Sequence, residues 1–213
     1  MSLDKKYDLV MLYSGGADSR LMLHWALQLR KKVYCILVDY GQKHIAELEY
    51  AIKHLTELGV AYQVVKLSGL NIDSGLTGNL VESRWENVHS ANVPGRNSMF
   101  ISIAYSIAEN FGVTEIWYGP DYSDFENKFP DCYQSYVGNM NEVLKTAGVR
   151  PIKLYAPLLG WTKEMILEYL EKVVCVDMSE VHSGYEAPVK KCTCKHESCE
   201  VPECDCIIEN GLV

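Results

Sequence analysis

Ser14-Gly15-Gly16-Ala17-Asp18-Ser19 is the stretch that decides the fold. An apolar run over residues 7–13 precedes it and is typical of a buried strand. The apolar face of a helix follows it, formed by Leu21, Leu23, Trp25, Ala26 and Leu29. A strand, a glycine turn and a helix in this order direct backbone N–H groups and a positive helix end to one point. The stretch therefore predicts an anion-binding turn.

The residue types of this turn suit a bound phosphate. Gly15 and Gly16 let the backbone approach a ligand without a Cβ in the way. Ser14 and Ser19 add hydroxyl donors, and Asp18 can hold a cation or cap the turn. No Lys-Ser or Lys-Thr pair follows the glycines, so the turn is not a Walker A loop. It resembles the PP-loop, S-G-G-x-D-S, of enzymes that split ATP between the α and β phosphates; a plain glycine turn is the alternative.

Length and composition are those of an ordinary soluble globular protein. The chain has 213 residues, 48% of them hydrophobic and 23% charged, which is enough for one domain with a small appendage. Its net charge of −8 argues against a nucleic-acid surface over the whole protein. No run reaches the roughly 18 apolar residues of a membrane span, and no signal peptide precedes the first strand. We therefore expect a cytoplasmic protein with no membrane partner and no direct nucleic-acid partner.

Strands and helices alternate along the chain, which predicts right-handed crossovers and a parallel sheet. Further strands are expected at residues 33–38, 62–67, 114–119 and 152–156. A helix ending at Gly59 has one apolar side, formed by Leu48, Ala51, Ile52, Leu55 and Leu58. Later helices are expected at residues 96–110, 133–146 and 162–172. Residues 68–92 show no period and predict either a lid over a substrate or a plain surface loop.

The expected fold class is α/β, a Rossmann-like (PP-loop/HUP) parallel sheet flanked by helices. Residues 1–175 would form the ATP-binding domain, and residues 176–213 a small zinc-binding appendage. Ligands of such sheets bind outside the carboxyl ends of the strands. Asp18, Asp39 and Gln42 lie there, and so does the polar and aromatic segment after the fourth strand. Arg96, at a helix start after a Pro-Gly turn, can contact phosphate or carboxylate with two parallel hydrogen bonds, although a solvated arginine is the simpler reading.

The C-terminal segment is crowded with thiols at Cys192, Cys194, Cys199, Cys204 and Cys206. In a reducing cytoplasm such a cluster predicts a metal site and not a disulfide framework. Zn²⁺ takes four thiolates in closed structural sites, so we expect a structural zinc and leave open which four bind it. Iron–sulfur ligation and five free cysteines are the alternatives, with His182 and His196 as reserve ligands.

Taken together, these motifs resemble the 7-cyano-7-deazaguanine synthases, PP-loop enzymes that make the nitrile precursor of queuosine and archaeosine. The resemblance covers nearly the whole chain. The family's D-Y-G-Q-R-H-x-x-E is similar to residues 39–47, and its V-P-G-R-N matches residues 93–97 in full. Its later G…D-F…Y-P-D-C and P-L…K patterns resemble Gly119, Asp124-Phe125, residues 130–132, residues 157–158 and Lys163.

Three departures from the family pattern concern the site and the tail. Tyr133 stands where the family has Arg after P-D-C, and the spacing between Asp124 and Pro130 is one residue longer. Gly184 stands in place of the first zinc cysteine, and the later cysteines are more numerous and more widely spaced. We interpret the extra thiol as a replacement for the missing one.

The resemblance implies an ATP-dependent carbon–nitrogen ligase that converts 7-carboxy-7-deazaguanine and ammonia to the 7-cyano base through adenylated intermediates. It implies ATP, Mg²⁺ and Zn²⁺ as cofactors and suggests a homodimer. The ATP-binding set would be Tyr13, Ser14, Gly15, Gly16, Ala17, Asp18, Ser19, Asp39, Gln42 and Arg96. The catalytic set would be Ser14, Asp18, Ser19, Arg96 and Lys163, with Lys163 on pyrophosphate. The base pocket would be shaped by Asp124, Phe125 and Asp131.

Other functions share parts of this pattern. A related enzyme could stop at the amide or transfer the deazaguanine to another acceptor, and the mass of the product separates these outcomes. A tRNA-modifying PP-loop enzyme would ordinarily carry a catalytic cysteine pair or a basic RNA-binding domain. A nucleotide sensor without catalysis would bind ATP without turning it over.

Overall fold

The computed structural model describes residues 6–41, 45–68 and 93–174. Its strands are β1 (Leu9–Leu12), β2 (Val33–Asp39), β3 (Ala61–Lys66), β4 (Glu115–Trp117) and β5 (Lys153–Tyr155). Its helices are α1 (Ala17–Gln28), α2 (Ile45–Glu57), α3 (Arg96–Phe111), α4 (Tyr122–Glu126), α5 (Gln134–Ala147) and α6 (Lys163–Tyr169). A 3-10 turn at Pro130–Cys132 precedes α5, and a π-helical turn at Leu170–Val174 continues α6.

Within the described residues, the strands form one parallel sheet in the order β3-β2-β1-β4-β5. Leu9 pairs with Val33 on one side of β1, and Met11 pairs with Trp117 on the other. The chain moves outward from β1 to β3 and then returns to the other side of β1 for β4. The direction of winding therefore reverses between β1 and β4, and such a switch point is where ligands of parallel sheets bind.

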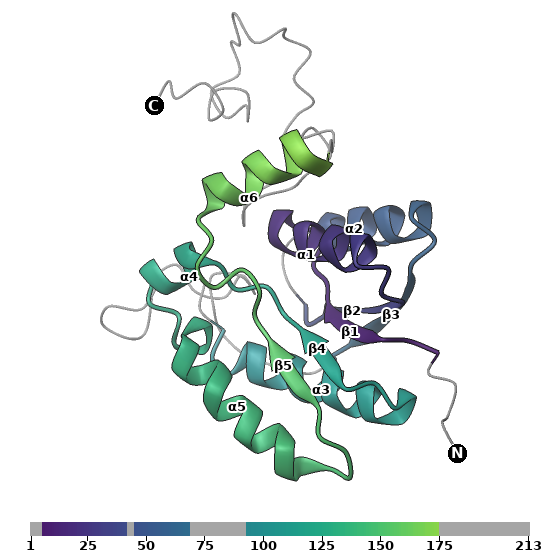
Figure 1. Cartoon of the computed structure of the whole chain (residues 1–213), viewed down its shortest axis with the longest axis vertical. Helices are drawn as coiled ribbons and strands as arrows, with labels where there is room; N and C mark the ends of the chain where they lie inside the picture. The colour runs from purple at the N-terminus through teal and green to yellow at the C-terminus, as the bar shows by residue number, and fades with distance from the viewer. Residues whose placement is uncertain (1–5, 42–44, 69–92, 175–213) are drawn as a thin grey trace, which may run out of the picture.

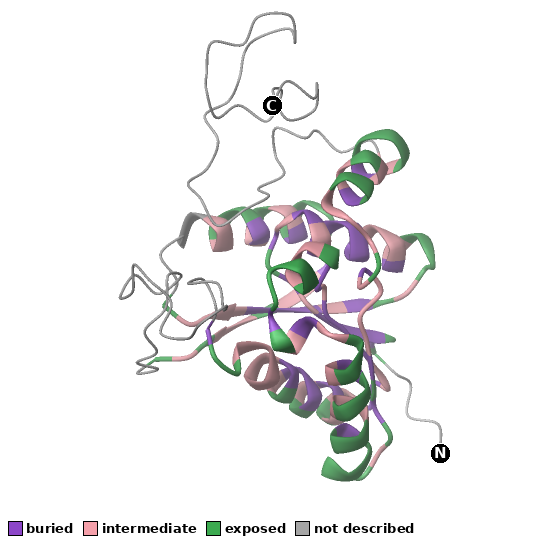
Figure 2. Ribbon diagram, turned by 90° about the vertical axis from the view of Figure 1, so that its left-hand side faces the viewer, coloured by how far each residue is buried: buried purple, intermediate pink, exposed green. Residues whose placement is uncertain are grey.

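Helices cover both faces of the sheet and enclose two apolar clusters. Helices α1, α2 and α6 lie on one face, and α3 and α5 lie on the other (Figure 1). Alternate residues of β1 supply both clusters, because Leu9 and Met11 face α1 while Val10 faces α3. Figure 2 shows the buried residues where the two helix layers face the sheet. These two layers hold the carboxyl ends of β1 and β4 in place.

The expected α/β fold and the alternation of elements are confirmed, with ends that differ by a few residues. Two positions assigned to apolar helix faces were wrong. Leu29 is 64% exposed because it follows the last turn of α1, and Leu58 is 40% exposed because α2 has already ended at Glu57. The loop expected at residues 68–92, Gln42 and the appendage at residues 176–213 lie largely or wholly outside the described residues. None of the described helices is long and apolar enough to cross a membrane.

Candidate active site

The turn between β1 and α1 packs closely against α2, and at position 15 only glycine fits. Gly15 has a φ of +88°, in the left-handed region that side chains disfavour. A Cβ built on Gly15 would lie 2.7 Å from the Cβ of Ala51 in α2. The position thus requires glycine for two independent reasons, conformation and space.

Two serines hold the backbone of this turn. The Ser19 hydroxyl accepts a hydrogen bond from the Gly15 N–H and donates one to the Gly16 carbonyl, both at 3.0 Å. The exposed Ser14 hydroxyl accepts a hydrogen bond from the Gly16 N–H at 3.3 Å. Gly16 is the N-cap of α1 and brings no side chain to cap the helix. No Gly16 side chain therefore occupies the positive end of α1. Helix N-termini with this geometry bind phosphate.

Lys163, the first residue of α6, connects this turn to the loop that follows β4. Its Nζ lies 2.7 Å from Oδ1 of Asp18 and 2.9 Å from Oδ2 of Asp121. Asp121 is 1% exposed, so its carboxylate requires a partner. Asp18 and Lys163 are partly exposed, with 25% and 34% of their side chains accessible. One ammonium thus joins two carboxylates at the switch point of the sheet.

The environment shifts the pKa values of these groups in different directions. Burial raises the pKa of Asp18, and Lys163 offsets this only in part. Burial also acts to raise the pKa of Asp121, but hydrogen bonds from Ser123 and the Lys163 ammonium hold it below its ordinary value. Burial alone would lower the pKa of Lys163, and the two carboxylates raise it instead. Lys163 is therefore a permanent cation at this edge.

A capping box fixes the loop after β4. The Asp121 side chain accepts from the N–H groups of Ser123 and Asp124, at 2.8 and 3.2 Å, and Asp124 accepts from the Asp121 N–H at 3.0 Å. Burial, with the nearby charges of Asp121 and Asp18, raises the pKa of Asp124 to about 6. Asp121 therefore has two tasks, capping α4 and pairing with Lys163.

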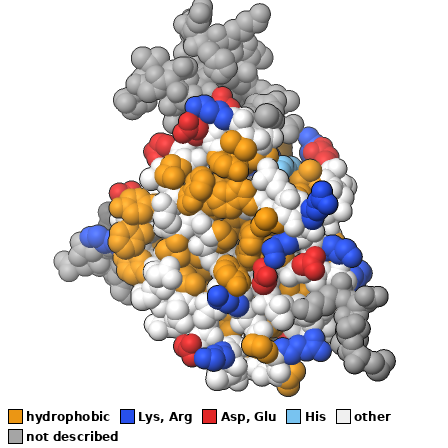
Figure 3. All heavy atoms as spheres, viewed as in Figure 1, with side chains coloured by type: hydrophobic (Ala, Val, Ile, Leu, Met, Phe, Trp, Pro, Cys, Tyr) orange, Lys and Arg blue, Asp and Glu red, His pale blue; other side chains and the backbone are white. Residues whose placement is uncertain are grey.

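Aromatic side chains extend the site from α4 to the start of α5. Phe125 is 46% exposed, and its ring centroid lies 5.7 Å from that of Tyr122 and 5.1 Å from that of Tyr133. In the space-filling view, hydrophobic side chains gather over α4 and between α6 and α1 (Figure 3). Exposed ring faces of this kind can stack on a planar base.

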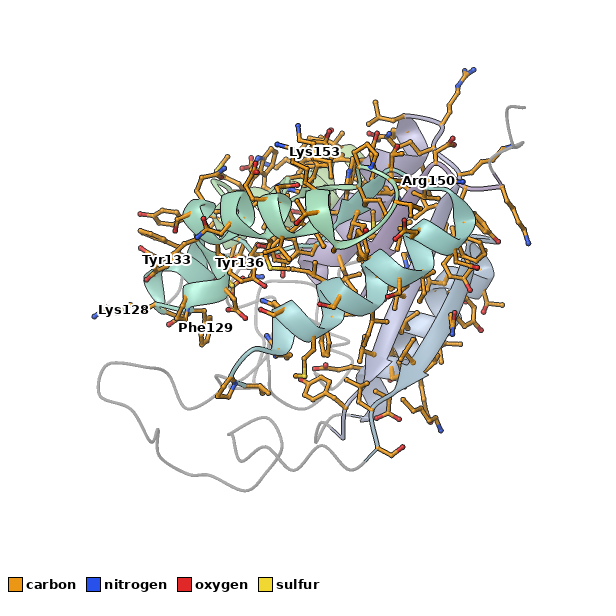
Figure 4. All side chains as sticks on the ribbon, turned by 90° about the horizontal axis from the view of Figure 1, so that it is seen from below. Lys128, Phe129, Tyr133, Tyr136, Arg150 and Lys153 are labelled. Atoms are coloured by element: carbon orange, nitrogen blue, oxygen red, sulfur yellow. The ribbon has the colours of Figure 1, made fainter. Side chains whose placement is uncertain are left out.

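A polar strip lies beside these rings. The Tyr118 hydroxyl donates to the Asp131 carbonyl at 3.3 Å, and the Ser98 and Tyr136 hydroxyls are 2.8 Å apart. The Asn97 amide lies 3.8 Å from the buried Cys132 sulfur. Figure 4 shows Tyr133 and Tyr136 with Lys128 and Phe129 at one end of the molecule, away from Arg150. The start of α3 and the start of α5 are thus held together at the site.

The remaining residues expected at the site lie in different surroundings. Arg96 begins α3, and its guanidinium donates to the Tyr40 hydroxyl at 3.4 Å. Asp39 accepts from the Gly41 N–H at 3.2 Å at the end of β2. Tyr13 is 3% exposed, and its hydroxyl lies 2.6 Å from Nδ1 of His54 in the interior. Its side chain therefore lies in the interior and is bonded to α2, while Ala17 is buried in the first turn of α1.

The sequence-based prediction did not select Asp121, although it noted the polar and aromatic segment after the fourth strand that contains it. Its position could have indicated a site residue, because Asp121 follows Gly119-Pro120 just after the carboxyl end of β4, where ligands of parallel sheets bind. The cysteines expected to bind metal lie outside the described residues. Within the described part, no group of three or more His, Cys, Asp or Glu side chains could hold a metal ion.

Comparison with known proteins identifies the family. The sequence model described as "Queuosine biosynthesis protein QueC" matches residues 8–205. The chain belongs to the QueC family. It is 33% identical over 211 residues to a 7-cyano-7-deazaguanine synthase of Psychromonas ingrahamii, covering 95% of this chain and 94% of the relative. It is 35% identical over 167 residues to the synthase of Alteromonas mediterranea, covering 75% and 76% of the two chains.

Solved structures of distant sequence share the fold of this QueC family member. The U34-tRNA thiolase NcsA from Methanococcus maripaludis, with its [4Fe-4S] cluster, matches with a TM-score of 0.53 at 14% identity, over 79% of this chain and 58% of that one. A predicted tRNA methyltransferase subunit from Methanocaldococcus jannaschii matches with a TM-score of 0.53 at 18% identity, over 78% and 74%. At these identities the likeness concerns the arrangement of sheet and helices alone.

Proposed function

We propose that this QueC family member is a 7-cyano-7-deazaguanine synthase, which uses ATP to convert 7-carboxy-7-deazaguanine and ammonia to the nitrile. The observation that carries the proposal is the Asp18–Lys163–Asp121 arrangement beside the glycine turn, in a chain whose relatives are named for this activity. N–H groups suited to an anion, the Lys163 cation and carboxylates lie together at one switch point of the sheet, which supports this proposal.

The turn would bind the ATP phosphates. The N–H groups at the start of α1 and the exposed Ser14 hydroxyl are donors suited to a polyphosphate. The Ser19 hydroxyl would join them by turning its proton from the Gly16 carbonyl to the phosphate. Lys163 would stabilise the negative charge that develops on pyrophosphate as it leaves. Arg96 would contact a phosphate or the carboxylate of the base, with Asp39 nearby on the nucleotide side.

Mg²⁺ suits the carboxylate oxygens of this edge. Asp18, Asp121 and Asp124 provide more acidic groups than the single ammonium of Lys163 can balance. Mg²⁺ commonly uses one or two carboxylates together with substrate phosphates, so Asp18 would hold the ion or one of its waters. When bound, the ion would neutralise charge on the phosphates.

The deazaguanine would lie on the aromatic side of the site. Phe125 offers an exposed ring face for stacking, and Asp124 and Asp131 offer carboxyl groups for the polar edge of a base. Tyr133 is in ring contact with Phe125, so it contributes an aromatic surface where the family has arginine.

The cysteine-rich appendage would hold one structural Zn²⁺ through four of its five thiols, as its composition suggests. The division into residues 1–175 and 176–213 has the same basis. The homodimer and the carbon–nitrogen ligase class rest on the family resemblance alone, and the cytoplasmic location stays an expectation from the sequence.

An exchange assay tests the proposed reaction. The full chain is incubated with ATP, Mg²⁺ and labelled pyrophosphate, with and without 7-carboxy-7-deazaguanine. We expect label to enter ATP only when the base is present, and added ammonia to yield the nitrile mass. Exchange that does not depend on the base would refute the substrate, and an amide as the only product would identify the enzyme that stops one step earlier.

A further inference from the structure

A buried guanidinium lies directly behind the phosphate-binding turn. Arg20, in the first turns of α1, is 2% exposed, and its Nε donates a 2.9 Å hydrogen bond to the carbonyl of Gly15. Arginine is almost never fully buried unless it is paired. The reaction described above does not employ this residue.

The bond to Gly15 determines which way the next N–H points. None of the described peptide bonds is cis, and in a trans peptide the carbonyl of one residue and the N–H of the next point in opposite directions. With the Gly15 carbonyl held by Arg20 on the buried side, the Gly16 N–H points to the other side. The exposed Ser14 hydroxyl lies there, at 3.3 Å from that nitrogen.

Gly15 and Gly16 are consecutive glycines, so the orientation of the peptide between them is not fixed by the backbone itself. Glycine adopts positive and negative φ about equally well, so the peptide between Gly15 and Gly16 could rotate at little cost. A rotated peptide would present a carbonyl oxygen to an incoming phosphate where an N–H is needed. The Arg20 hydrogen bond opposes that rotation from behind.

Among the described residues, the groups around Arg20 leave its charge uncompensated. Burial raises the pKa of Tyr13 above its ordinary range, and burial with the Arg20 charge lowers the pKa of His54 to about 4. Burial and the same charge lower the pKa of His24. These side chains are all neutral at pH 7, and no carboxylate in the described part of the chain lies within ion-pair distance of Arg20. Its positive charge is therefore available to the turn.

We propose that Arg20 is a positioning residue for polyphosphate binding: it aims the Gly16 N–H at the bound phosphate and adds a fixed positive charge behind the turn. It would do this without contacting the ligand. The inference rests on the proposed function, since it requires the turn to bind phosphate.

Calorimetric titration of the full chain tests it with two probes, inorganic pyrophosphate with Mg²⁺ and adenosine. Arg20→Met keeps the length of the side chain but removes the charge and the donor. We expect it to weaken pyrophosphate binding about tenfold, the scale of one lost charge-assisted hydrogen bond. Adenosine binding should change less than about twofold, because adenosine has no phosphate. Arg20→Lys, which keeps a charge and a donor, should restore most of the affinity for pyrophosphate.

Lys31→Gln is the matched control. Lys31 pairs with Glu115 at 2.9 Å beside the starts of β2 and β4, at the opposite edge of the sheet, and its loss removes one partly buried positive charge. It should leave pyrophosphate binding unchanged. A folded Arg20→Met variant with the affinity of the unmodified chain would overturn the inference and leave the proposed function standing.

If Arg20→Met does not fold, the inference is tested by NMR on the unmodified chain. The Gly16 amide proton should move downfield in the NMR spectrum as pyrophosphate is added, because that N–H acquires an anionic acceptor. Pyrophosphate binding with no change at Gly16 would overturn the inference alone. An unmodified chain that bound neither ATP nor pyrophosphate would overturn the proposed function and the inference with it.

Discussion

Lys163 and Asp18 are separated by 145 residues in the sequence, yet Nζ of one lies 2.7 Å from Oδ1 of the other. The same Nζ reaches the buried carboxylate of Asp121. The contact joins α6 to α1 across the switch point of the sheet, so the last described helix completes a site that begins at the first turn.

Removal of Lys163 should lower the stability of the fold. Lys163→Met leaves Asp18 and Asp121 without their cation, and we expect the free energy of unfolding in urea to fall by about 2 kcal/mol. This is less than the roughly 3–5 kcal/mol for a fully buried pair, since Lys163 is one-third exposed. Asp121→Asn removes the charge that pairs with Lys163 but keeps the oxygen that caps α4. Because the two residues are paired, the Lys163→Met/Asp121→Asn double variant should lose less free energy of unfolding than the sum of the two single variants. Additive losses would show that the two residues are not coupled.

Gly15→Ala should be more damaging than another substitution at a similar φ. Gly59 has a φ of +65° with nothing within 4 Å of a built Cβ, so Gly59→Ala measures the conformational cost alone, about 1 kcal/mol. Gly15→Ala adds the 2.7 Å approach to Ala51 and should lower the free energy of unfolding by about 2 kcal/mol or more. It should also weaken ATP binding, which Gly59→Ala should not. Equal costs at the two sites would argue against close packing of the turn on α2.

Asp124 should make the folded protein less stable as pH rises. Its pKa is about 6 in the fold against an ordinary 3.8, so the folded state holds a proton that the unfolded chain releases between these values. Relative to Asp124→Asn, the free energy of unfolding of the unmodified chain should fall by up to about 3 kcal/mol as pH rises from about 4 to about 6. Urea unfolding at several pH values measures this difference. Parallel stability curves for the two proteins would refute the raised pKa.

His54 should make the folded protein less stable as pH falls. Its pKa falls from 6.5 to about 4 on folding, because burial and the Arg20 charge disfavour the protonated ring. The unfolded chain therefore binds the proton first, and stability present above about pH 6.5 is lost as pH falls toward about 4. His54→Gln, which stays neutral and can still hydrogen-bond Tyr13, should reduce this acid sensitivity. An unchanged acid slope in the variant would contradict the prediction.

Zinc removal should release thiols of the appendage and leave the core thiols protected. Cys35 and Cys132 are buried, and burial raises the pKa of both. We expect native mass spectrometry to find one Zn²⁺ per chain. A chelator should then make the tail cysteines reactive toward a thiol reagent, while Cys35 and Cys132 stay unreactive until the fold opens. Five reactive tail thiols before chelation would exclude the zinc site.

Local patterns accounted for most of the fold. The apolar run before the turn and the 3.6-residue period after it predicted β1 and α1, because each pattern depends on neighbours within one turn or strand. Helix α4 was not predicted, since five residues are too few to show a period. Leu29 and Leu58 were misplaced because each lies one residue beyond a helix end, and helix ends are poorly marked in sequence.

The sequence by itself determined the glycine turn after β1, because Ser14, Gly15, Gly16 and Ser19 interact with one another over a few residues. The tertiary structure decided which distant groups serve that turn. Only the parallel sheet brings Asp121 and Lys163 to Asp18, and only the packing of α1 on the sheet buries Arg20 behind Gly15. The physical reason is that burial and charge pairing depend on contacts between segments far apart in the chain, which no local pattern records.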